Sequence, residues 1–435
     1  MLNKRSLLSQ FLHFSAATVA SLMVFSLYSI VDGLFVAKGV GEYAMSAVNL
    51  AVPFTNVMFS IAVLFAVGTS TIIAIYLGQG RRENANSLFS QNLAVLVVIG
   101  LVISALVLIF LEPFAMLLGA KDVTLEYTKD YLRGLAPFAV CFIVSYNMEI
   151  LVKTDGRPTL AIVTVITGCL TNCVLDYVAI FLLDWGMFGA ALATSLGYVV
   201  GAVMILAYLS RRRNVIRFCR VKTSRKSLRL TRRNVGYMCR LGLSTFLCEG
   251  AIAAMMFTGN YVFIRRLGED GVAAFSIACY FFPIIFMVYN AIGQSAQPIL
   301  SYNFGAGRSD RVRSAFRLAM ATAVAVGLLF FLLTALCSPW IVGMFLDATY
   351  PAYGIAVSGL PLFASGFVFF AFNIVSIGYF QSVEQARAAM TVTLLRGFLF
   401  LVVCFLALPP LFGVAGIWLA VPCSEVLAAA AVVAI

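Results

Sequence analysis

The sequence predicts an all-α membrane protein with twelve transmembrane helices in two six-helix pseudo-symmetric bundles. Three observations lead to this fold class: the composition, twelve long apolar runs, and a second half that repeats the first. The 435 residues are 62% hydrophobic and 11% charged, with a mean hydropathy of +1.00. A soluble domain carries about 25% charged residues, so this chain cannot cover a water-facing surface, and a cytosolic enzyme is excluded.

The twelve apolar runs are each long enough to cross a bilayer, which requires about 20 residues per helix. Several of them contain proline, which favours tilted or kinked helices around a protein-lined interior. Reading between charged residues and Gly/Pro breaks, we expect the spans at 11–37, 45–77, 88–112, 131–152, 159–183, 187–209, 236–264, 271–304, 314–342, 352–380, 388–408 and 412–435.

The net charge of +12 resides in one segment. From Arg211 to Arg240 there are twelve basic residues and no acidic one, so the rest of the chain is neutral. With a cytoplasmic N-terminus, 23 of the 30 lysines and arginines fall on the cytoplasmic side, as the positive-inside rule requires. We therefore expect a multi-pass protein of the inner (plasma) membrane with both termini cytoplasmic. Its basic segment should contact anionic lipid headgroups, and no nucleic acid.

The two halves of the chain repeat one another. After a shift of 227 residues, segment 41–81 matches segment 268–308 at ten of 41 positions. Each copy has an even number of spans, so both copies should share one topology, with a cavity between them. The same register also holds late in each half. The glycine pairs of the repeat include Gly41/Gly268, Gly80/Gly307 and Gly186/Gly413.

Two related bundles around a cavity are typical of secondary transporters that work by alternating access. The segment Gly78 to Arg81 lacks the lysine and the hydroxyl of a phosphate-binding loop, which favours an ion gradient over ATP. The ten cysteines show no metal-ligand spacing, so we expect no cofactor and no metal centre. The expected division is an N-terminal bundle at 1–209, a basic cytoplasmic linker at 210–235 and a C-terminal bundle at 236–435.

Two aspartates inside the spans are the strongest functional candidates. Ionisable groups at bilayer depth cost roughly 2.5–3.5 kcal/mol each, so they need a reason. Asp32 lies in the first span and Asp176 in the fifth, with Asn172 one turn before it. The repeat pairs them with Gly259 and Val403, so packing symmetry does not require these acids. We expect the two carboxylates to share a proton or coordinate a cation; a structural hydrogen-bonded pair is the alternative.

Other polar residues in the spans could line the cavity or stabilise the fold. Arg396 and Glu425, on the eleventh and twelfth spans, are expected to form a structural ion pair. Glu249 on the seventh span either attracts a cation or is solvated near the cytoplasmic end. The abundant Phe, Tyr and Met residues suit hydrophobic cations. The expected substrate-binding residues are Tyr28, Asn147, Glu249, Gln294, Gln297 and Asn373.

Several segments resemble the multidrug and toxic compound extrusion (MATE) family, over nearly the whole chain. Residues 30–36 (IVDGLFV) and 47–53 (AVNLAVP) look like the opening helices of that family, and residues 294–308 (QSAQPILSYNFGAGR) are similar to the end of its eighth helix in the MepA-like branch. Further resemblances lie at 172–176 (NCVLD), 186–194 (GMFGAALAT) and 378–381 (GYFQ).

This resemblance implies a V-shaped pair of bundles that exports cationic, amphipathic drugs in exchange for protons or sodium, as a monomer. Residue by residue, Asp32, Asn172, Asp176 and Thr194 take the ion-coupling and substrate-linked positions of the family's N-terminal lobe. If sodium is the ion, the first three would bind it. The tenth-helix aspartate that some members use for sodium is missing here, and Asn373 is the nearest polar residue.

Three other functions are open at this point. A flippase for lipid-linked oligosaccharides shares the duplicated bundle, but it would need a strongly cationic cavity, and only Arg396 is available deep inside the membrane. A major-facilitator transporter would carry an acidic and basic loop that is absent between Leu77 and Asn86. A membrane scaffold or sensor would need neither Asp32 nor Asp176.

Overall fold

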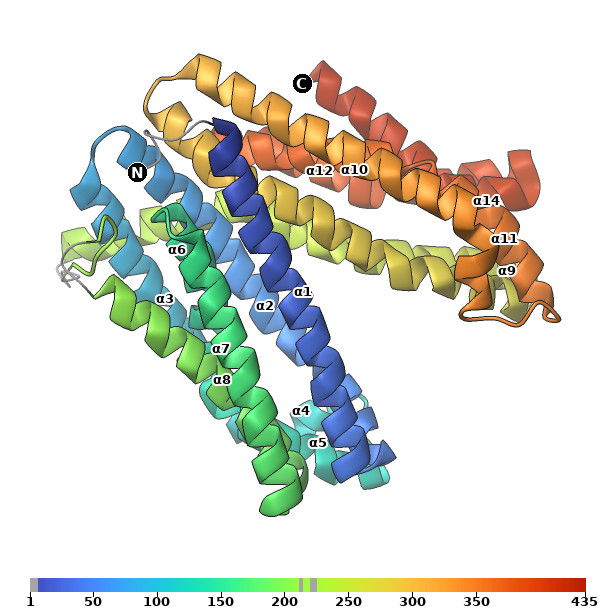
Figure 1. Ribbon diagram of the computed structural model, residues 1–435, viewed down its shortest axis with the longest axis horizontal. Coiled ribbons are helices and arrows are strands. Elements are labelled where there is room, and N and C mark those ends of the chain that lie inside the picture. The colour runs from blue at the N-terminus through green and yellow to red at the C-terminus, as the bar shows by residue number, and fades with distance from the viewer. Residues whose placement is uncertain (1–6, 211–213, 220–224) are drawn as a thin grey trace. The chain divides into compact units, whose positions relative to one another are not determined.

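A computed structural model describes residues 7–210, 214–219 and 225–435, and these residues are nearly all helical, with no β-strand among them (Figure 1). Helices are expected because lipid offers no hydrogen bonds to the backbone. The expected linker at 210–235 and the N-terminus lie partly outside the described residues. The first half contains α1 (Leu7–Gly39), α2 (Glu42–Gly78), α3 (Arg82–Ile109), α4 (Leu111–Leu117), α5 (Asp122–Leu135), η1 (Ala136–Phe138), α6 (Ala139–Thr154), α7 (Pro158–Asp176), η2 (Tyr177–Leu182) and α8 (Gly186–Leu209).

The second half begins with α9, which is far too long to be a single span. Its 81 residues would extend about 120 Å as one rod, whereas the hydrocarbon core is about 30 Å thick. The elements of this half are α9 (Arg225–Gly305), α10 (Ser309–Gly343), α11 (Pro351–Ala364), α12 (Phe367–Ser382), α13 (Ala386–Leu394), η3 (Leu395–Leu399) and α14 (Phe400–Ala434).

Two helical hairpins explain the number of spans. Within the described ranges, nine helical segments are long and apolar enough to cross a membrane, and α11 with α12 forms a tenth that bends by 43°. Two of the nine are interrupted by a glycine with left-handed φ, Gly268 in α9 and Gly413 in α14. Phe263 and Phe275, on either side of Gly268, stack with their ring centroids 4.5 Å apart, so the chain turns back there. With two spans in each hairpin, the segments give the twelve predicted spans.

The internal repeat is present in the backbone as well as in the sequence. Three glycine pairs related by the 227-residue shift all have positive φ, a region that other residues rarely adopt. The same sharp turns therefore recur in both halves, and the predicted pseudo-symmetric fold is confirmed. The φ values are 118° and 67° for Gly41 and Gly268, 77° and 70° for Gly80 and Gly307, and 53° and 57° for Gly186 and Gly413.

The described residues form two compact units. Unit 1 contains residues 12–242, and unit 2 combines 7–11 with 243–435. Helix α1 therefore contributes its first turn to unit 2, where Phe11 is buried in the apolar core. Helix α9 begins in unit 1, where Gly242 packs so closely on the backbone carbonyl of Leu64 that a Cβ would not fit.

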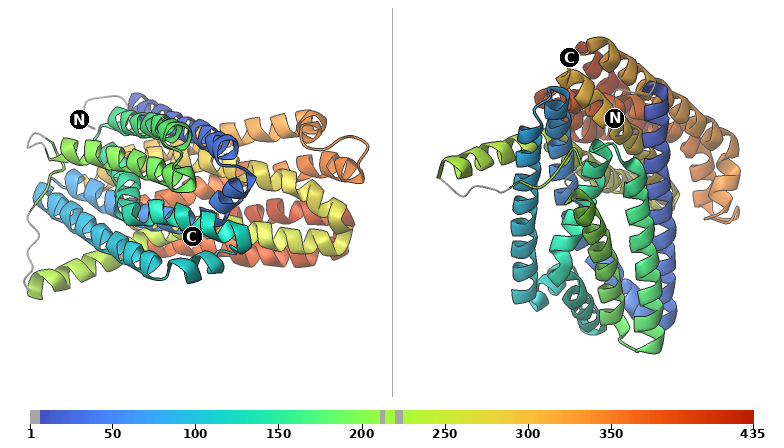
Figure 2. Two further views of the ribbon diagram at one scale, coloured as in Figure 1. Left: turned by 90° about the horizontal axis from the view of Figure 1, so that it is seen from below. Right: turned by 60° about the vertical axis from the view of Figure 1, so that its left-hand side comes forward.

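Each unit has its own helix packing. In unit 1, α7 runs along α8 and α2 packs on α6; α7 and α8 stay side by side in the further views (Figures 1 and 2). In unit 2, α12 packs on α10 and α14. Its core is centred on buried Trp418, whose ring makes edge contacts with Phe263, Phe275 and Phe363. Large aromatic side chains dominate the energetics of such a core.

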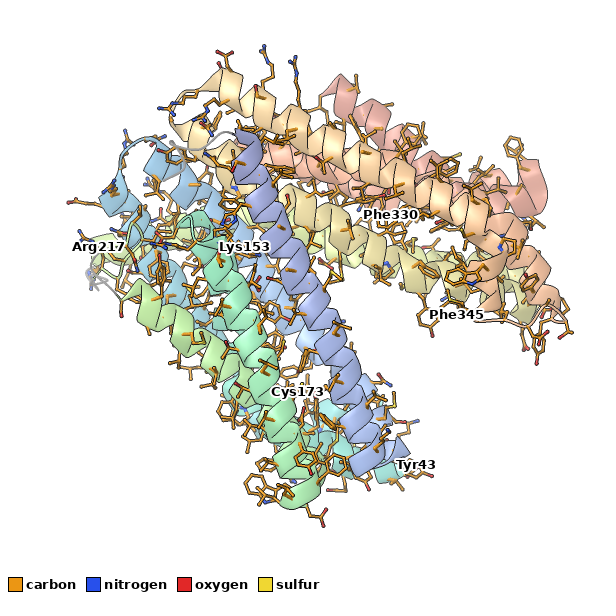
Figure 3. All side chains as sticks on the ribbon, in the orientation of Figure 1. Tyr43, Lys153, Cys173, Arg217, Phe330 and Phe345 are labelled. Carbon is orange, nitrogen blue, oxygen red and sulfur yellow. The ribbon has the colours of Figure 1, made fainter. Side chains whose placement is uncertain are left out.

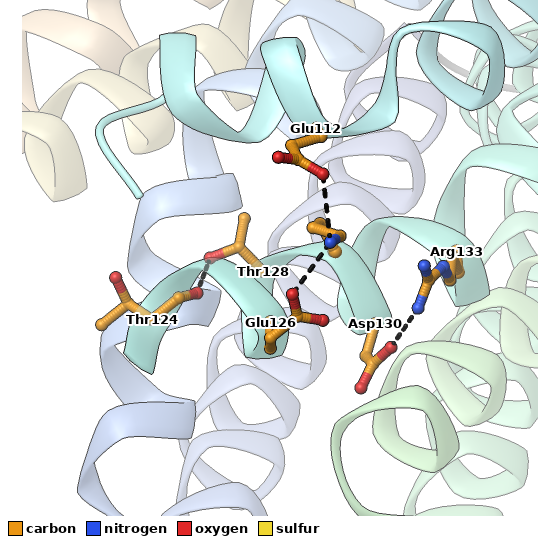
Figure 4. Close-up of polar contacts among 7 residues, drawn as sticks. Glu112, Thr124, Glu126, Thr128, Asp130 and Arg133 are labelled. Carbon is orange, nitrogen blue, oxygen red and sulfur yellow. Dashed lines mark hydrogen bonds and ion pairs between the residues drawn. The ribbon is translucent and has the colours of Figure 1, made fainter. Parts of the chain in front are cut away.

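A helical corner formed by α4 and α5 was not anticipated from the sequence. It is amphipathic rather than apolar, and α5 begins nine residues before the span expected at 131–152. Lys129 Nζ lies 2.9 Å from Glu126 Oε1 and 3.4 Å from Glu112 Oε2, and Arg133 Nη1 lies 2.8 Å from Asp130 Oδ1 (Figure 4). These carboxylates are well exposed, so the pairs orient the corner more than they stabilise it.

The described part of the linker, residues 214–219, is held on unit 1 by side chains. Asp155, just after α6, accepts the Ile216 N–H at Oδ1 and the Tyr208 hydroxyl at Oδ2, both at 2.8 Å. Burial raises the pKa of the Asp155 carboxyl, and the two hydrogen bonds act in the opposite direction. Two further acceptors hold the same segment. Asn86 Oδ1 accepts the Arg217 N–H, and Ser90 Oγ accepts the Cys219 N–H. Arg217 is labelled in Figure 3 and marks the place of this segment.

Replacing Asp155 by Ala should release this segment. The variant leaves the buried Ile216 N–H without its acceptor, at a cost of about 1–2 kcal/mol, which raises the open population roughly 5- to 30-fold. Trypsin cleavage after Arg217, an exposed residue, measures that population. Asp155→Asn is the matched control, because its amide can still bond both partners. An unchanged cleavage rate in Asp155→Ala would show that the other acceptors alone hold the segment.

Candidate functional site

The two aspartates singled out in the sequence come together inside unit 1. Asp32 on α1 and Asp176 on α7 are neighbours within interaction range, and both interact with Asn172. Asp176 and Asn172 are fully buried. Asn172 Nδ2 donates to Thr194 Oγ1 at 3.2 Å, and Thr194 donates in turn to the Ala190 carbonyl. We call these residues, Asp32, Asn172, Asp176 and Thr194, the ionic centre; Cys173, labelled in Figure 3, marks its position on α7.

The ionic centre contains hydrogen-bond acceptor oxygens for which the described residues supply no donor. Four buried oxygens receive no hydrogen bond of ordinary length and angle from the described residues: Asp32 Oδ1, both carboxylate oxygens of Asp176, and Asn172 Oδ1. Neither aspartate forms an ion pair with a described basic side chain. Because buried polar atoms are normally satisfied, such a group of oxygens is suited to hold a proton or an oxygen-coordinated cation.

The backbone beside Asp176 is irregular. Helix α7 ends at Asp176 and continues as η2, one turn of π-helix at Tyr177–Leu182. π-Helical turns inside α-helices are frequent at functional sites, because the extra residue redirects the side chains around it. Asn172 lies one turn before Asp176 on the same helix face, which is why the sequence spacing already placed them together.

Tyrosines from three helices, α1, α5 and α8, lie next to the ionic centre. Tyr28, Tyr131 and Tyr198 all lie close enough to Asp32 for electrostatic interaction. Tyr28 and Tyr131 also lie within range of Asp176. Tyr198 packs on Phe142 and Tyr146, with ring centroids 4.4 and 5.8 Å apart. Tyr28 was expected from the sequence, but Tyr131, Tyr146 and Tyr198 were not. Aromatic faces next to carboxylates are suited to organic cations.

The remaining expected substrate residues lie elsewhere. Asn147 is buried in unit 1 and bonded to Asn92 Nδ2 at 2.8 Å and to the Ala62 carbonyl at 3.2 Å. Glu249, Gln294 and Gln297 are on α9 in unit 2; Glu249 forms no ion pair with a described residue, and Gln297 is buried. The structure therefore groups Tyr28 with the ionic centre and gives Asn147 hydrogen-bond partners within the helix packing.

Asn373 belongs to a separate polar cluster in unit 2. Arg396 donates from Nη1 to Glu425 Oε1 at 2.8 Å, so the expected ion pair is present. Asn373 donates from Nδ2 to Glu425 Oε2 at 2.7 Å and to the Glu425 carbonyl at 2.9 Å. The side chains of Arg396 and Glu425 are 3% and 4% exposed. We call Asn373, Arg396 and Glu425 the unit 2 cluster.

Twelve apolar spans in two repeated units, with two adjoining carboxylates that lack a basic partner in the spans of unit 1, define a multi-pass membrane transporter rather than an enzyme. Comparison with known proteins identifies the family. The MatE family model matches residues 17–178 and 248–406, one match in each half of the chain. The chain therefore belongs to the MatE family, and the predicted family resemblance is confirmed.

Individual relatives agree with this assignment along the whole chain. The multidrug export protein MepA of Staphylococcus saprophyticus is 22% identical over 95% of this chain and 90% of that protein, and its counterpart in Staphylococcus haemolyticus is 24% identical over 95% and 89%. A solved structure described as MATE in the bent conformation superimposes with a TM-score of 0.87 at 23% identity, covering 99% of this chain and 94% of its own. The likeness to the solved structure establishes the fold alone.

Proposed function

We propose that this transporter is a secondary active multidrug exporter that exchanges cationic, amphipathic compounds for protons, with sodium as the alternative ion. Asp32 and Asp176 are the coupling carboxylates in this proposal. The observation that carries it is the ionic centre, where two buried carboxylates adjoin each other with open acceptor oxygens and without a basic partner. The relatives are multidrug export proteins, which supports the substrate class.

Antiport requires that the ion and the substrate exclude each other, and the ionic centre offers a physical reason. A proton or a sodium ion on the two carboxylates cancels the charge that would attract an organic cation, so the two ligands compete. Thr194 holds the Asn172 amide nitrogen, so the amide oxygen remains available to the same ligands. Tyr28, Tyr131 and Tyr198 would contact the aromatic or apolar part of the substrate.

The setting of this exporter is part of the proposal. It would work as a monomer in the plasma membrane, with both termini cytoplasmic, by alternating access of two lobes at 1–209 and 236–435 joined by a basic linker at 210–235 that contacts anionic lipid. The distribution of lysine and arginine supports the orientation. A lipid-linked oligosaccharide flippase is less well supported, because the buried bases Arg396 and Lys153 are already neutralised by Glu425 and Glu149.

The function is tested with purified protein in liposomes and a permanently charged fluorescent dye, which a pH gradient alone cannot trap. A pH gradient that is acidic inside the liposomes should drive dye into them. A sodium gradient with the higher concentration inside the liposomes tests the alternative ion separately. An ionophore that collapses the active gradient should release the dye. Dye levels equal to those of protein-free liposomes under both gradients would contradict the exchange of cations for protons or sodium.

A further inference from the structure

The unit 2 cluster has open hydrogen-bonding positions of its own. Arg396 Nε, Asn373 Oδ1 and Tyr289 Oη are buried and have no hydrogen-bond partner in the part of the chain that the structure describes. The Arg396 guanidinium lies 4.9 Å over the Phe370 ring, and the Tyr289 ring centroid is 5.4 Å from the same ring. Tyr289 also lies close enough to Glu425 for electrostatic interaction. The three open atoms thus belong to side chains gathered around one carboxylate.

The repeat relates this cluster to the ionic centre. A shift of 227 residues pairs Glu425 with Tyr198, which borders Asp32 in unit 1. Asn373 falls within one residue of the equivalent of Asn147. The two units therefore place polar groups at related positions, but the charges of their carboxylates are compensated differently. In unit 1 the two carboxylates of the ionic centre lack a basic partner, whereas in unit 2 Glu425 receives the guanidinium of Arg396.

The oxygens around Arg396 would suit a hard cation. Both carboxylate oxygens of Glu425, the open amide oxygen of Asn373 and the Tyr289 hydroxyl are the oxygen ligands that such ions prefer. A guanidinium remains charged at every physiological pH and is covalently attached. A site that it occupies can therefore exchange neither protons nor sodium.

We propose that Arg396 is a resident cation that occupies a latent cation site formed by Glu425, Asn373 and Tyr289, and that it thereby excludes inorganic cations from this site. The consequence, that this site takes no part in ion coupling, rests on the proposed function. The latent site itself rests on the contacts within unit 2.

The test removes the guanidinium in a background that lacks the unit 1 carboxylates. In purified Asp32→Asn/Asp176→Asn protein, a further Arg396→Met substitution should lower the unfolding temperature in choline chloride. Replacing choline by sodium at constant ionic strength should then raise it saturably, by several degrees, because a ligand that binds only the folded state stabilises it. The parent with Arg396 and the variant that also carries Glu425→Gln should show no saturable rise. Equal sodium responses in all three proteins, or none in any, would overturn the proposal.

A second variant keeps the test decisive if Arg396→Met does not fold. Arg396→Gln is neutral and can still bond Glu425, so it disturbs the packing less. In the same background it should bind one more radioactive sodium ion per chain than the parent with Arg396. Binding no greater than that of the parent would overturn the latent site. Since Asp32 and Asp176 are absent from these proteins, neither outcome depends on whether the wild type exchanges dye for protons.

Discussion

Replacing Asp32 by Asn should reduce gradient-driven dye accumulation to the level of protein-free liposomes. The amide has nearly the shape of the carboxyl group, but it can neither carry a titrating proton nor contribute the negative charge that holds a cation next to Asp176. Because Asp32 Oδ1 accepts no hydrogen bond from the described residues, the substitution should leave the folded protein intact. Initial rates of dye uptake, with unfolding temperatures measured in parallel, check both statements.

The matched control is Glu112→Gln in the same unit. Glu112 is a well-exposed carboxylate at the α4–α5 corner, so the same chemical change there should leave the uptake rate within about twofold of the wild type. Asp176→Asn should behave like Asp32→Asn. A protein with Asp32→Asn that still accumulates dye under a proton or a sodium gradient would refute Asp32 as a coupling residue.

Replacing Glu425 by Leu should destabilise the protein by about 3–5 kcal/mol, because it leaves the Arg396 guanidinium buried without a counter-ion. The double variant Arg396→Met/Glu425→Leu should recover most of this loss, since two apolar side chains can replace a buried ion pair at little cost. The Asn373 amide nitrogen keeps the backbone carbonyl of residue 425 as a partner in both proteins. Unfolding by dodecyl sulfate in mixed micelles measures these free energies; the detergent is supplied as its choline salt, so that sodium and potassium are absent.

The exposed pair Arg133–Asp130 provides the comparison. Asp130→Ala should change the unfolding free energy far less than Glu425→Leu, because water replaces the lost partner. If Glu425→Leu and the double variant were equally unstable, the loss would come from packing around residue 425 and not from the unpaired charge of Arg396.

Much of the fold could be predicted from the sequence because lipid imposes a strong physical pattern. The apolar runs located the spans, and the repeat located the same sharp turns in both halves, at Gly41 and Gly268 for example. The α4–α5 corner was missed because α4 is only seven residues long and α5 is amphipathic, so neither has an apolar run long enough to cross a membrane. The hydrogen bonds that hold residues 214–219 on unit 1 were missed because the acceptor side chains, such as Asp155, are distant in sequence.

The site was predictable only in part. Asp32 and Asp176 were identified as candidates because charges in lipid are rare and because the repeat has no acid at their equivalent positions. Glu149 and Lys153, four residues apart on α6, form an ion pair whose atoms lie 3.0 Å apart, and Lys153 is buried, which its sequence spacing does not indicate. Tyr131 and Tyr198 carried no distinguishing signal among 17 tyrosines, and only the packing of α5 and α8 brings them to Asp32.

The sequence by itself determined that lipid surrounds this protein and how many times the chain crosses the membrane. It also determined that the two halves are related and that Asp32 and Asp176 lie inside the spans. These features could be predicted because hydropathy and periodicity are local properties of the chain. The tertiary structure decided how these charges are arranged, apart from the Arg396–Glu425 ion pair, which the sequence had already predicted. Asp32 and Asp176 adjoin each other without a basic partner, whereas Glu425 receives the guanidinium of Arg396. Electrostatic interactions depend on distances between helices, and those distances are fixed by packing that no local pattern specifies.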